Sequence, residues 1–348
     1  DNELNKYMEE AVKVSNDSPV LLDHFLDKAI EVDIDAVSDG ENILIGGIME
    51  HIEQAGVHSG DSACSIPPIT LSLEIQDQLI KQMIAFTKKL NVIGLVNAQF
   101  AVRKNKIFIL EVNPRASRTV PFVSKATGNQ LAKIAAKAMI GVSLNEQNEM
   151  FSHTPGFFSV KSAVFPFNKF PDTDPILGPE MKSTGEVMGT GKTFSEAYIK
   201  SQYASGTEFS LSGSVFISVR EPDKTEQLIN ISQKLINQQY KLIATKGTYE
   251  FLVKNNIDCS CINKVHEGKP HIVEKIKNKE IDLIINTTEG KQSIKESFSI
   301  RAEAVIKNVT YYTSLEAAIA TIDSLDYFNN IDINKIQNYK YNKVIKNG

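Results

Sequence analysis

Hydrophobic positions recur with a period close to 3.6 residues across 72–90. The apolar residues in this stretch are Leu73, Ile75, Leu79, Ile80, Met83, Ile84, Phe86 and Leu90. Such a period is typical of an amphipathic helix with one side against a core. Ser72 immediately precedes it and is a suitable N-cap. The pattern therefore predicts a helix here, and a second one at 131–140.

Short β-rich runs surround the first of these helices. Residues 94–102 and 107–112 are two such runs on either side of a polar turn, and 20–45 has the pattern of strands joined by a turn at 38–40. The first part of the chain is therefore predicted to be α+β with antiparallel pairing. Residues 141–210 have a weaker pattern and hold most of the later Pro and Gly residues.

Beyond about residue 212, strands and helices alternate. Strands are predicted at 214–219, 241–244, 261–265, 281–286 and 310–312, and helices at 224–238, 247–255, 270–279, 291–307 and 314–325. Repeated strand–helix units predict a parallel sheet covered on both faces. We place the domain boundary so that 1–206 and 207–348 are separate domains. In the second, ligands are expected beyond the carboxyl ends of the strands.

The composition narrows the class of protein. The chain has 348 residues, 42% of them hydrophobic, which is enough for two cores. With 38 Lys and Arg against 42 Asp and Glu, it has no overall positive charge to attract nucleic acid or an anionic membrane. No apolar run approaches the roughly 18 residues that span a bilayer. Three cysteines favour a reducing compartment. We expect a cytoplasmic protein with neither nucleic-acid nor membrane partners.

The first residues contain neither an initiator Met nor the pattern of a signal peptide. We therefore expect the chain to be a piece of a longer protein, so that part of an active site would lie outside it.

The sharpest group of polar residues is Gln99 on one β-rich run with Glu111, Asn113, Arg115 and Arg118 at the end of the next. Positions i and i+2 of a strand share a face, so Glu111 and Asn113 point the same way, and a hairpin can bring Gln99 beside them. One carboxylate with amide oxygens suits Mg²⁺ when a nucleotide and water supply its other ligands. The two arginines suit phosphoryl oxygens. The alternative is a solvated strand face that ends at a turn.

A second polar run extends from 50 to 62 and contains glycines that would let a ligand approach the backbone. Glu31 interrupts an apolar strand and could accept hydrogen bonds from ribose hydroxyls. For His24, His51 and His58 individually, a hydrogen-bonded structural role is favoured over catalysis. No Ser-His-Asp order or metal-binding His/Cys spacing is present, and Cys259 and Cys261 fit buried thiols better than a zinc site.

In the second domain, two polar loops follow strands. Thr245 and Thr248 belong to one, and Asn286, Thr287 and Thr288 to the other. Hydroxyls, backbone N–H groups and a helix N-terminus there would suit a phosphate, with Lys264 adding charge. The alternative is that the threonines only cap helices.

Two stretches of the sequence are specific enough to indicate a protein family. EHIEQAGVHSGDSAC at 50–64 and EVNPRASRTVPFVSKATG at 111–128 resemble the large chains of bacterial-type carbamoyl-phosphate synthases, in their second, carbamoyl-phosphate-forming half. The resemblance continues to about residue 325. It implies a partial ATP-grasp domain of the α+β class, followed by an α/β methylglyoxal-synthase-like (MGS-like) allosteric domain with a parallel sheet.

The resemblance also implies an activity and partners. The expected reaction is the phosphorylation of carbamate by ATP to carbamoyl phosphate, in a glutamine-hydrolysing ligase of pyrimidine and arginine synthesis. The expected cofactors are ATP with Mg²⁺ or Mn²⁺. The expected partners are the missing N-terminal part of the large chain, a glutamine amidotransferase small chain, and a nucleotide effector such as UMP or IMP.

Site residues are implied position by position. Gln99, Glu111 and Asn113 match metal and nucleotide contacts, Glu31 the ribose contact, and Arg115 and Arg118 the catalytic arginines near the reacting phosphoryl group. Positions that line the nucleotide match His24, Leu26, Gly56, Val57, His58 and Ser59. Positions that hold the effector nucleotide match Lys224, Thr245, Thr248, Lys264, Asn286, Thr287 and Thr288.

Two departures qualify the resemblance. The family's glycine-rich phosphate loop and an arginine would precede Asp1, so we expect the chain alone to be inactive. For an amino-acid activator known in some relatives, Glu53, Asp61 and Thr313 match. Ser162 replaces a carboxylate and Tyr311 a histidine, so a weak or absent response is expected.

Two other functions remain open from sequence. One is another ATP-grasp carboxylate ligase, such as a biotin carboxylase or a purine-synthesis enzyme, although neither carries the βα domain at this point. The other is a catalytically silent module that binds nucleotides and regulates.

Overall fold

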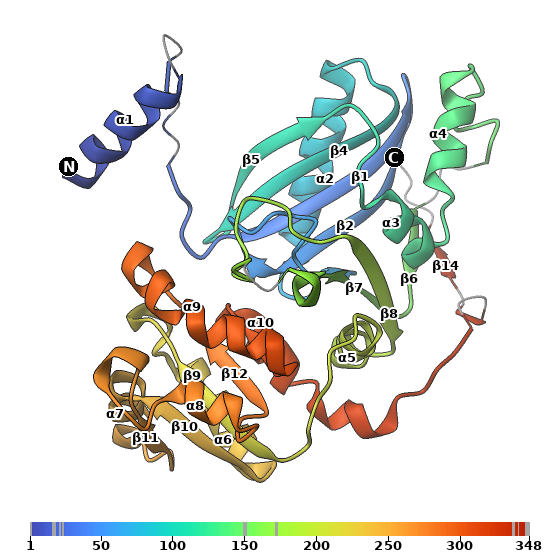
Figure 1. Ribbon diagram of the computed structural model, residues 1–348. Coiled ribbons are helices and arrows are strands. Elements are labelled where there is room, and N and C mark those ends of the chain that lie inside the picture. Colours follow the sequence, from blue (N-terminus) through green and yellow to red (C-terminus); the bar gives the residue numbers. More distant parts are fainter. Residues whose placement is uncertain are drawn as a thin grey trace.

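A computed structural model describes residues 2–15, 19–20, 22, 24–148, 152–170, 173–335, 338–339 and 341–344. It contains a seven-stranded sheet and a five-stranded sheet, joined by one segment of chain (Figure 1). The helix α1 (Asn2–Ser15) precedes both sheets.

The seven-stranded sheet is antiparallel and has the order β5-β4-β1-β2-β3-β7-β8. Its strands are β1 (Ile30–Asp39), β2 (Ile43–Gln54), β3 (Cys64–Ile66), β4 (Ile93–Arg103), β5 (Lys106–Asn113), β7 (Phe158–Val164) and β8 (Gly185–Gly191). One face packs on α2 (Leu73–Lys89), whose Leu79 and Met83 are fully buried against alternate residues of β1 and β4. Ser72 accepts a hydrogen bond from the Ile75 N–H, which confirms the predicted N-cap.

The opposite face of this sheet is covered by α3 (Val120–Thr127) and α4 (Leu131–Met139). The helix α5 (Phe194–Ala204) packs on the same face as α2, over Val160 of β7. The helix α5 lies so close to β8 that a Cβ atom at Gly189 would collide with the backbone at Ala197 and Ser201. The glycine at this position therefore reflects the distance between helix and strand.

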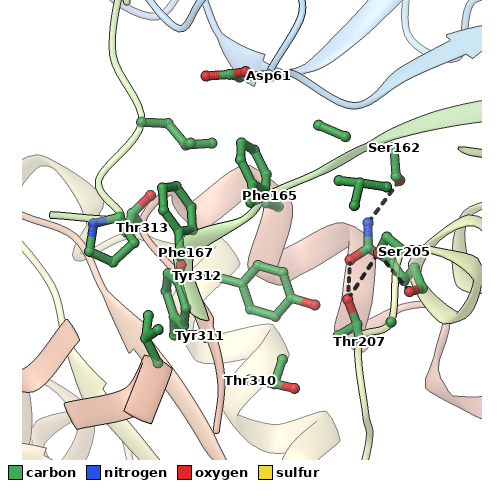
Figure 2. Close-up of a pocket in the computed structure, with 18 of the residues that line it drawn as sticks. Asp61, Ser162, Phe165, Phe167, Ser205, Thr207, Thr310, Tyr311, Tyr312 and Thr313 are labelled. Carbon is green, nitrogen blue, oxygen red and sulfur yellow. Dashed lines mark hydrogen bonds between the residues drawn. The ribbon is translucent and has the colours of Figure 1, made fainter. Parts of the chain in front are cut away.

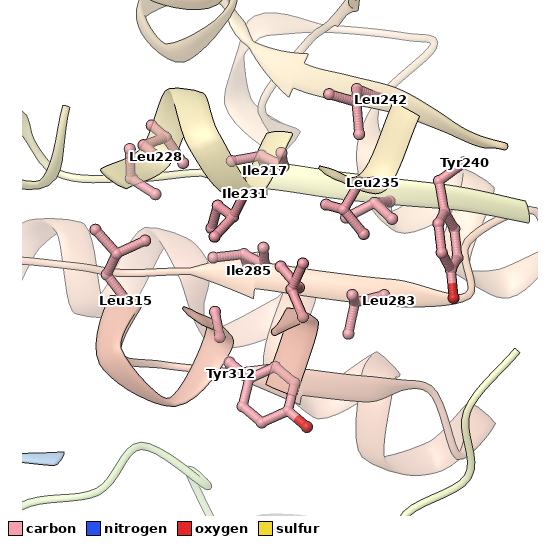
Figure 3. Close-up of a cluster of buried hydrophobic side chains, with 14 of the residues drawn as sticks. Ile217, Leu228, Ile231, Leu235, Tyr240, Leu242, Leu283, Ile285, Tyr312 and Leu315 are labelled. Atoms are coloured by element: carbon pink, nitrogen blue, oxygen red, sulfur yellow. The ribbon is translucent and has the colours of Figure 1, made fainter. Parts of the chain in front are cut away.

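The five-stranded sheet is entirely parallel, with the order β11-β10-β9-β12-β13. Its strands are β9 (Gly213–Ser218), β10 (Tyr240–Thr245), β11 (Ser260–Ile262), β12 (Leu283–Asn286) and β13 (Thr310–Tyr312). On one face lie α6 (Glu226–Asn237), α7 (Lys246–Lys254) and α10 (Leu315–Ile322), whose apolar residues form the core in Figure 3. The other face is covered by α8 (Ile272–Lys277) and α9 (Gly290–Lys307). The predicted parallel α/β sheet is confirmed.

The first part differs from its prediction at three places. The first strand begins at Ile30, and its partner continues to Gln54, so the first residues of the polar run at 50–62 belong to β2. The helix α3 and the elements β7, β8 and α5 were not predicted. Polar residues at buried positions of β7, including Ser159 and Lys161, conceal its strand pattern.

The two sheets are connected by buried polar contacts. Arg301 on α9 is fully buried and donates two hydrogen bonds, of 2.7 and 2.6 Å, to Asp174 in the segment between β7 and β8. The Tyr198 hydroxyl on α5 donates to the Ala317 carbonyl on α10. The C-terminal strand β14 (Tyr341–Val344) returns to the first part and pairs with β6 (Ser152–Pro155) (Figure 1). The segment after Asp174 is therefore held at a fixed position between the sheets.

Candidate functional site

A polar face on the seven-stranded sheet forms the first candidate site. The even positions of β1 enter the core below α2, and the odd positions, Glu31, Asp33 and Asp35, face the other way. In register with them on β4 lie Asn97 and Gln99, which in turn pair with Asn113 and Glu111 on β5. Directly opposite residues of paired strands share a face. Three strands therefore present one continuous array of carboxylates and amides.

The predicted oxygen cluster forms the outer edge of this array. The Asn113 amide donates to Glu111 Oε1 at 2.7 Å, and the Gln99 amide donates to Ser59 Oγ at 3.2 Å. Glu111 is exposed, and Gln99 and Asn113 are half-buried. No group of three or more His, Cys, Asp or Glu residues suited to a metal occurs in the described ranges. The cluster has one carboxylate and two amide oxygens, which fits an ion that also takes ligands from a nucleotide and water.

Buried groups lie at the inner edge. His51 Nε2 is 3.0 Å from Asp33 Oδ2, and its Nδ1 is 3.9 Å from Glu31 Oε1. Burial alone would lower the pKa of His51, but the hydrogen bond and charge of Asp33, with the charge of Glu31, raise it. Burial raises the pKa of Glu31, although His51 and the Gly56 N–H oppose this. The charge of Asp33 and, to a smaller extent, that of Glu111 also raise the pKa of Glu31.

The loop after β2 lies beside this array. Gly56 has a φ of 110° and packs against the ring of Phe25, whose neighbours in sequence are exposed His24 and half-buried Leu26. Val57 follows Gly56 and makes a backbone bridge with Ala55. The predicted nucleotide-lining positions 24, 26 and 56–59 are thus brought to one edge of the sheet.

Hydrogen bonds to the sheet and to the segment between β7 and β8 hold the second half of this loop. His58 Nδ1 accepts a hydrogen bond from the Gly60 N–H, and the His58 N–H donates to the Gly178 carbonyl at 2.8 Å. The fully buried Lys161 donates to the Ser59 carbonyl at 2.9 Å. The backbone that would face a nucleotide is therefore held by the core and by the segment that follows Asp174.

The arginines lie on the loop between β5 and α3. Arg115 is exposed and donates to the Ala116 carbonyl. Arg118 contacts Met181 Sδ, lies 3.9 Å from Glu186 Oε1 and approaches Gly60. Arg118 therefore faces the loop of His58 and Ser59, and Arg115 extends into solvent.

Several residues of this site were not identified from sequence. They are Asp33, Asp35, Asn97, Ser117, Thr119 and Lys161. The alternation Glu31-Val-Asp33-Ile-Asp35 was the available signal, because acidic residues at every second position of an otherwise apolar strand must share a face.

A second candidate site lies at the carboxyl ends of β9, β10 and β12, in a cavity of about 230 Å³. Six of the seven predicted effector positions line it, namely Lys224, Thr245, Thr248, Lys264, Asn286 and Thr287. Thr288 follows directly; its hydroxyl, like Asn286 Oδ1, is buried without a hydrogen-bond partner in the described chain. Ser293, Glu296 and Ser297 of α9 also line the cavity and were not predicted.

The threonines of this cavity do not act as simple helix caps. Thr245 stands at the N-cap of α7, but its hydroxyl hydrogen-bonds with Ser218 and makes no capping bond. Thr248 and Thr287 accept hydrogen bonds from the backbone N–H groups of Val219 and Arg220. These bonds hold the strand ends together around the cavity.

A larger cavity, of about 550 Å³, lies between the two sheets (Figure 2). It contains all five residues considered for an amino-acid activator: Glu53, Asp61, Ser162, Tyr311 and Thr313. Asp61 already accepts hydrogen bonds from the Lys182 and Ser183 N–H groups. Ser162 is occupied by hydrogen bonds with Gln202 and Ser201.

Comparison with known proteins agrees with this architecture. Residues 1–147 match the family model "Carbamoyl-phosphate synthase L chain, ATP binding domain", and residues 227–313 match the MGS-like domain. The curated carbamoyl phosphate synthase large chains of Xanthomonas axonopodis pv. citri and Haemophilus ducreyi are both 53% identical to the chain. These alignments cover 94% and 99% of this chain but only 31% and 32% of the relatives.

Solved structures with partial similarity include the biotin carboxylase domain of a single-chain bacterial carboxylase, with a TM-score of 0.44 and 13% identity over 57% of each chain. A second is the biotin carboxylase domain of a thermophilic 2-oxoglutarate carboxylase, with a TM-score of 0.45 and 14% identity over 59% of this chain and 53% of that one.

The fold and its sites define a two-part protein in which ATP-grasp elements are followed by an MGS-like domain. The chain belongs to the carbamoyl phosphate synthase large-chain family, and it spans about a third of the length of the relatives it matches. The resemblance found in the sequence is thereby confirmed.

The burial of Glu53 generates a prediction about pH. Burial raises the pKa of Glu53 from an ordinary value of 4.5 to about 7, although Glu53 accepts a hydrogen bond from the Ala63 N–H. The folded state therefore binds this proton more tightly than the unfolded chain, so stability falls as the pH rises from about 4.5 through 7.

We expect Glu53→Gln to be more stable than wild type at pH 8 by up to about 3 kcal/mol, and to lose this advantage near pH 4.5. Denaturant unfolding at the two pH values measures the difference. The control Glu41→Gln changes an exposed carboxylate at the β1–β2 turn and should stay within about 0.5 kcal/mol of wild type. A Glu53→Gln variant less stable than wild type at pH 8 would contradict the expectation.

Proposed function

We propose that the chain is part of the large chain of a carbamoyl-phosphate synthase, a glutamine-hydrolysing ligase, and that it contributes to the site where ATP phosphorylates carbamate. The observation that carries this proposal is the array of Gln99, Glu111 and Asn113 across β4 and β5, with Arg118 facing the loop of His58 and Ser59. Phosphoryl transfer asks a protein mainly to position the reactants and neutralise charge. Oxygen ligands, arginines and an anchored loop are suited to both.

Each group has a proposed task. Gln99, Glu111 and Asn113 would hold Mg²⁺ or Mn²⁺ together with the nucleotide, and the bound ion would neutralise phosphate charge. Glu31 would accept hydrogen bonds from the ribose hydroxyls. The nucleotide would lie along His24, Leu26, Gly56, Val57, His58 and Ser59. Arg115 and Arg118 would stabilise the transferring phosphoryl group.

Partners and location follow from the same proposal. The chain would work with the preceding part of the large chain, which supplies the phosphate-covering loop, and with a glutamine amidotransferase small chain. Its products would enter pyrimidine and arginine synthesis in the cytoplasm. Within the described ranges, no helix has the length and apolar character to cross a membrane. Identity of 53% to two large chains favours this function over another ATP-grasp ligase or a silent nucleotide-binding module.

The nucleotide proposal predicts the effect of Glu111→Ala in the full-length protein. We expect the rate of ATP formation from carbamoyl phosphate and ADP to fall by about 10²-fold or more. Without the Glu111 carboxylate, the divalent ion that neutralises charge at the phosphoryl group would no longer be held in place. Glu111 is exposed, so stability should change by no more than about 0.5 kcal/mol. The control is Glu41→Ala, which removes an exposed carboxylate remote from the cluster in sequence. A normal rate in Glu111→Ala would contradict the assignment.

The cavity beside β9, β10 and β12 supports a nucleotide effector such as UMP or IMP. Lys224, Lys264 and several hydroxyls converge there, and Asn286 Oδ1 has no hydrogen-bond partner within the described chain. Cationic donors and hydroxyls at strand ends are suited to a phosphate.

We expect UMP or IMP to bind the 348-residue chain in calorimetry, and Lys264→Ala to weaken binding by about tenfold through loss of a charged hydrogen bond. Lys254→Ala is the matched control, because Lys254 is exposed at the end of α7. Absence of binding at millimolar nucleotide, or equal binding by Lys264→Ala, would remove this part of the proposal.

A further inference from the structure

The carboxylate of Asp35 on β1 makes an unusual set of contacts with the loop between β5 and α3, which carries Arg115 and Arg118 and is called the arginine loop below. Asp35 is 1% exposed and accepts hydrogen bonds from Ser117 Oγ at 2.7 Å, Thr119 Oγ1 at 2.6 Å and Asn97 Nδ2 at 3.0 Å. Ser117 and Thr119 are the residues on either side of Arg118. The carboxylate thus holds the loop on both sides of this arginine, with one oxygen for each hydroxyl.

The arrangement is costly as a purely structural feature. A buried carboxylate loses hydration, and the hydrogen-bonding side chains around Asp35 in the described structure are all neutral. Burial raises the pKa of Asp35 to about 6, and Asp33 adds to the rise, while the three hydrogen bonds oppose it. A well-packed apolar side chain at this position would avoid that cost.

Thr119 provides a second, independent sign. It stands at the N-cap of α3, where a threonine hydroxyl ordinarily accepts a hydrogen bond from the first turn. Thr119 makes no such capping bond, and its hydroxyl donates to Asp35 instead. The helix loses a cap, and the loop that carries Arg118 gains a fixed point on the central strand β1.

We propose that Asp35 is a positioning residue for Arg118, acting through the hydroxyls of Ser117 and Thr119. This inference rests on the proposed phosphoryl-transfer function, because it gives Arg118 a position that matters. The side chain of Arg118 is 45% exposed. Its position therefore depends mainly on its loop and on its contacts with Met181 and Glu186. Reacting groups must be placed closely, and a displacement of about 1 Å can cost around 10²-fold in rate.

The test is a double-mutant cycle in the full-length protein, with ATP formation from carbamoyl phosphate and ADP as the assay. Asp35→Asn should lower kcat by about 10- to 100-fold and change the KM for ADP by less than about threefold. Thr119→Val should lower kcat in the same direction, and Thr119→Ser, which keeps the hydroxyl, should restore it. In the Arg118→Ala background, Asp35→Asn should lower kcat by no more than about twofold further.

The matched control is Asp39→Asn on the same strand. Asp39 accepts hydrogen bonds from the Asn42 and Leu144 N–H groups and has no contact with the arginine loop in the described structure. Its replacement should leave kcat within about twofold of wild type. If Asp35→Asn does not fold, the same cycle is read from Thr119→Val with Arg118→Ala.

The outcomes separate the two claims. If Arg118→Ala has a normal rate, the catalytic assignment of the arginine is wrong and the positioning claim falls with it, whereas the activity itself stands. If the wild-type protein forms no ATP from carbamoyl phosphate and ADP, the proposed function fails. If Arg118→Ala is impaired but the effects of Asp35→Asn and Arg118→Ala multiply, Asp35 does not act through Arg118 and only the positioning claim fails. Equal rates for Thr119→Val and Thr119→Ser would also overturn it.

Discussion

The alternation of side chains along β1 is the constraint on which the first part of this chain depends. Val32, Ile34 and Ala36 face the core below α2, which obliges Glu31, Asp33 and Asp35 to face the other side. A shift of one residue would bury three carboxylates against the apolar helix. The same register that forms the core therefore fixes the polar array, and with it the cluster on β4 and β5.

The segment between β7 and β8 connects the sites with one another. Asp174 binds the buried Arg301 of α9, whose preceding turns supply Ser293, Glu296 and Ser297 to the cavity at the carboxyl ends of β9, β10 and β12. Farther along, Gly178 accepts a hydrogen bond from the His58 N–H, and Met181 contacts Arg118. The same connecting segment therefore contacts α9 at Asp174 and the loop of His58 and Ser59 at Gly178.

Sequence reasoning succeeded where the pattern is local. Continuous apolar runs such as Leu283–Ile285, followed by helices, predicted the parallel sheet. The side chains of Glu111 and Asn113 could be placed on one face by strand geometry alone. The strands β7 and β8 were missed because buried Ser159 and Lys161 disguise one, and the glycines that admit α5 disguise the other. Asp35 was missed because its partners, Ser117 and Thr119, are more than 80 residues away along the chain.

The central claim is that the cluster of Gln99, Glu111 and Asn113 on β4 and β5 binds a divalent ion together with a nucleotide. Electron paramagnetic resonance of Mn²⁺ with the full-length protein tests it most directly. One carboxylate and two amides are too few ligands to hold a strongly hydrated ion alone, so the free Mn²⁺ signal should fall markedly only when ADP is added, and not in Gln99→Ala. Equally tight binding of Mn²⁺ without nucleotide, or unchanged binding in Gln99→Ala, would contradict the account.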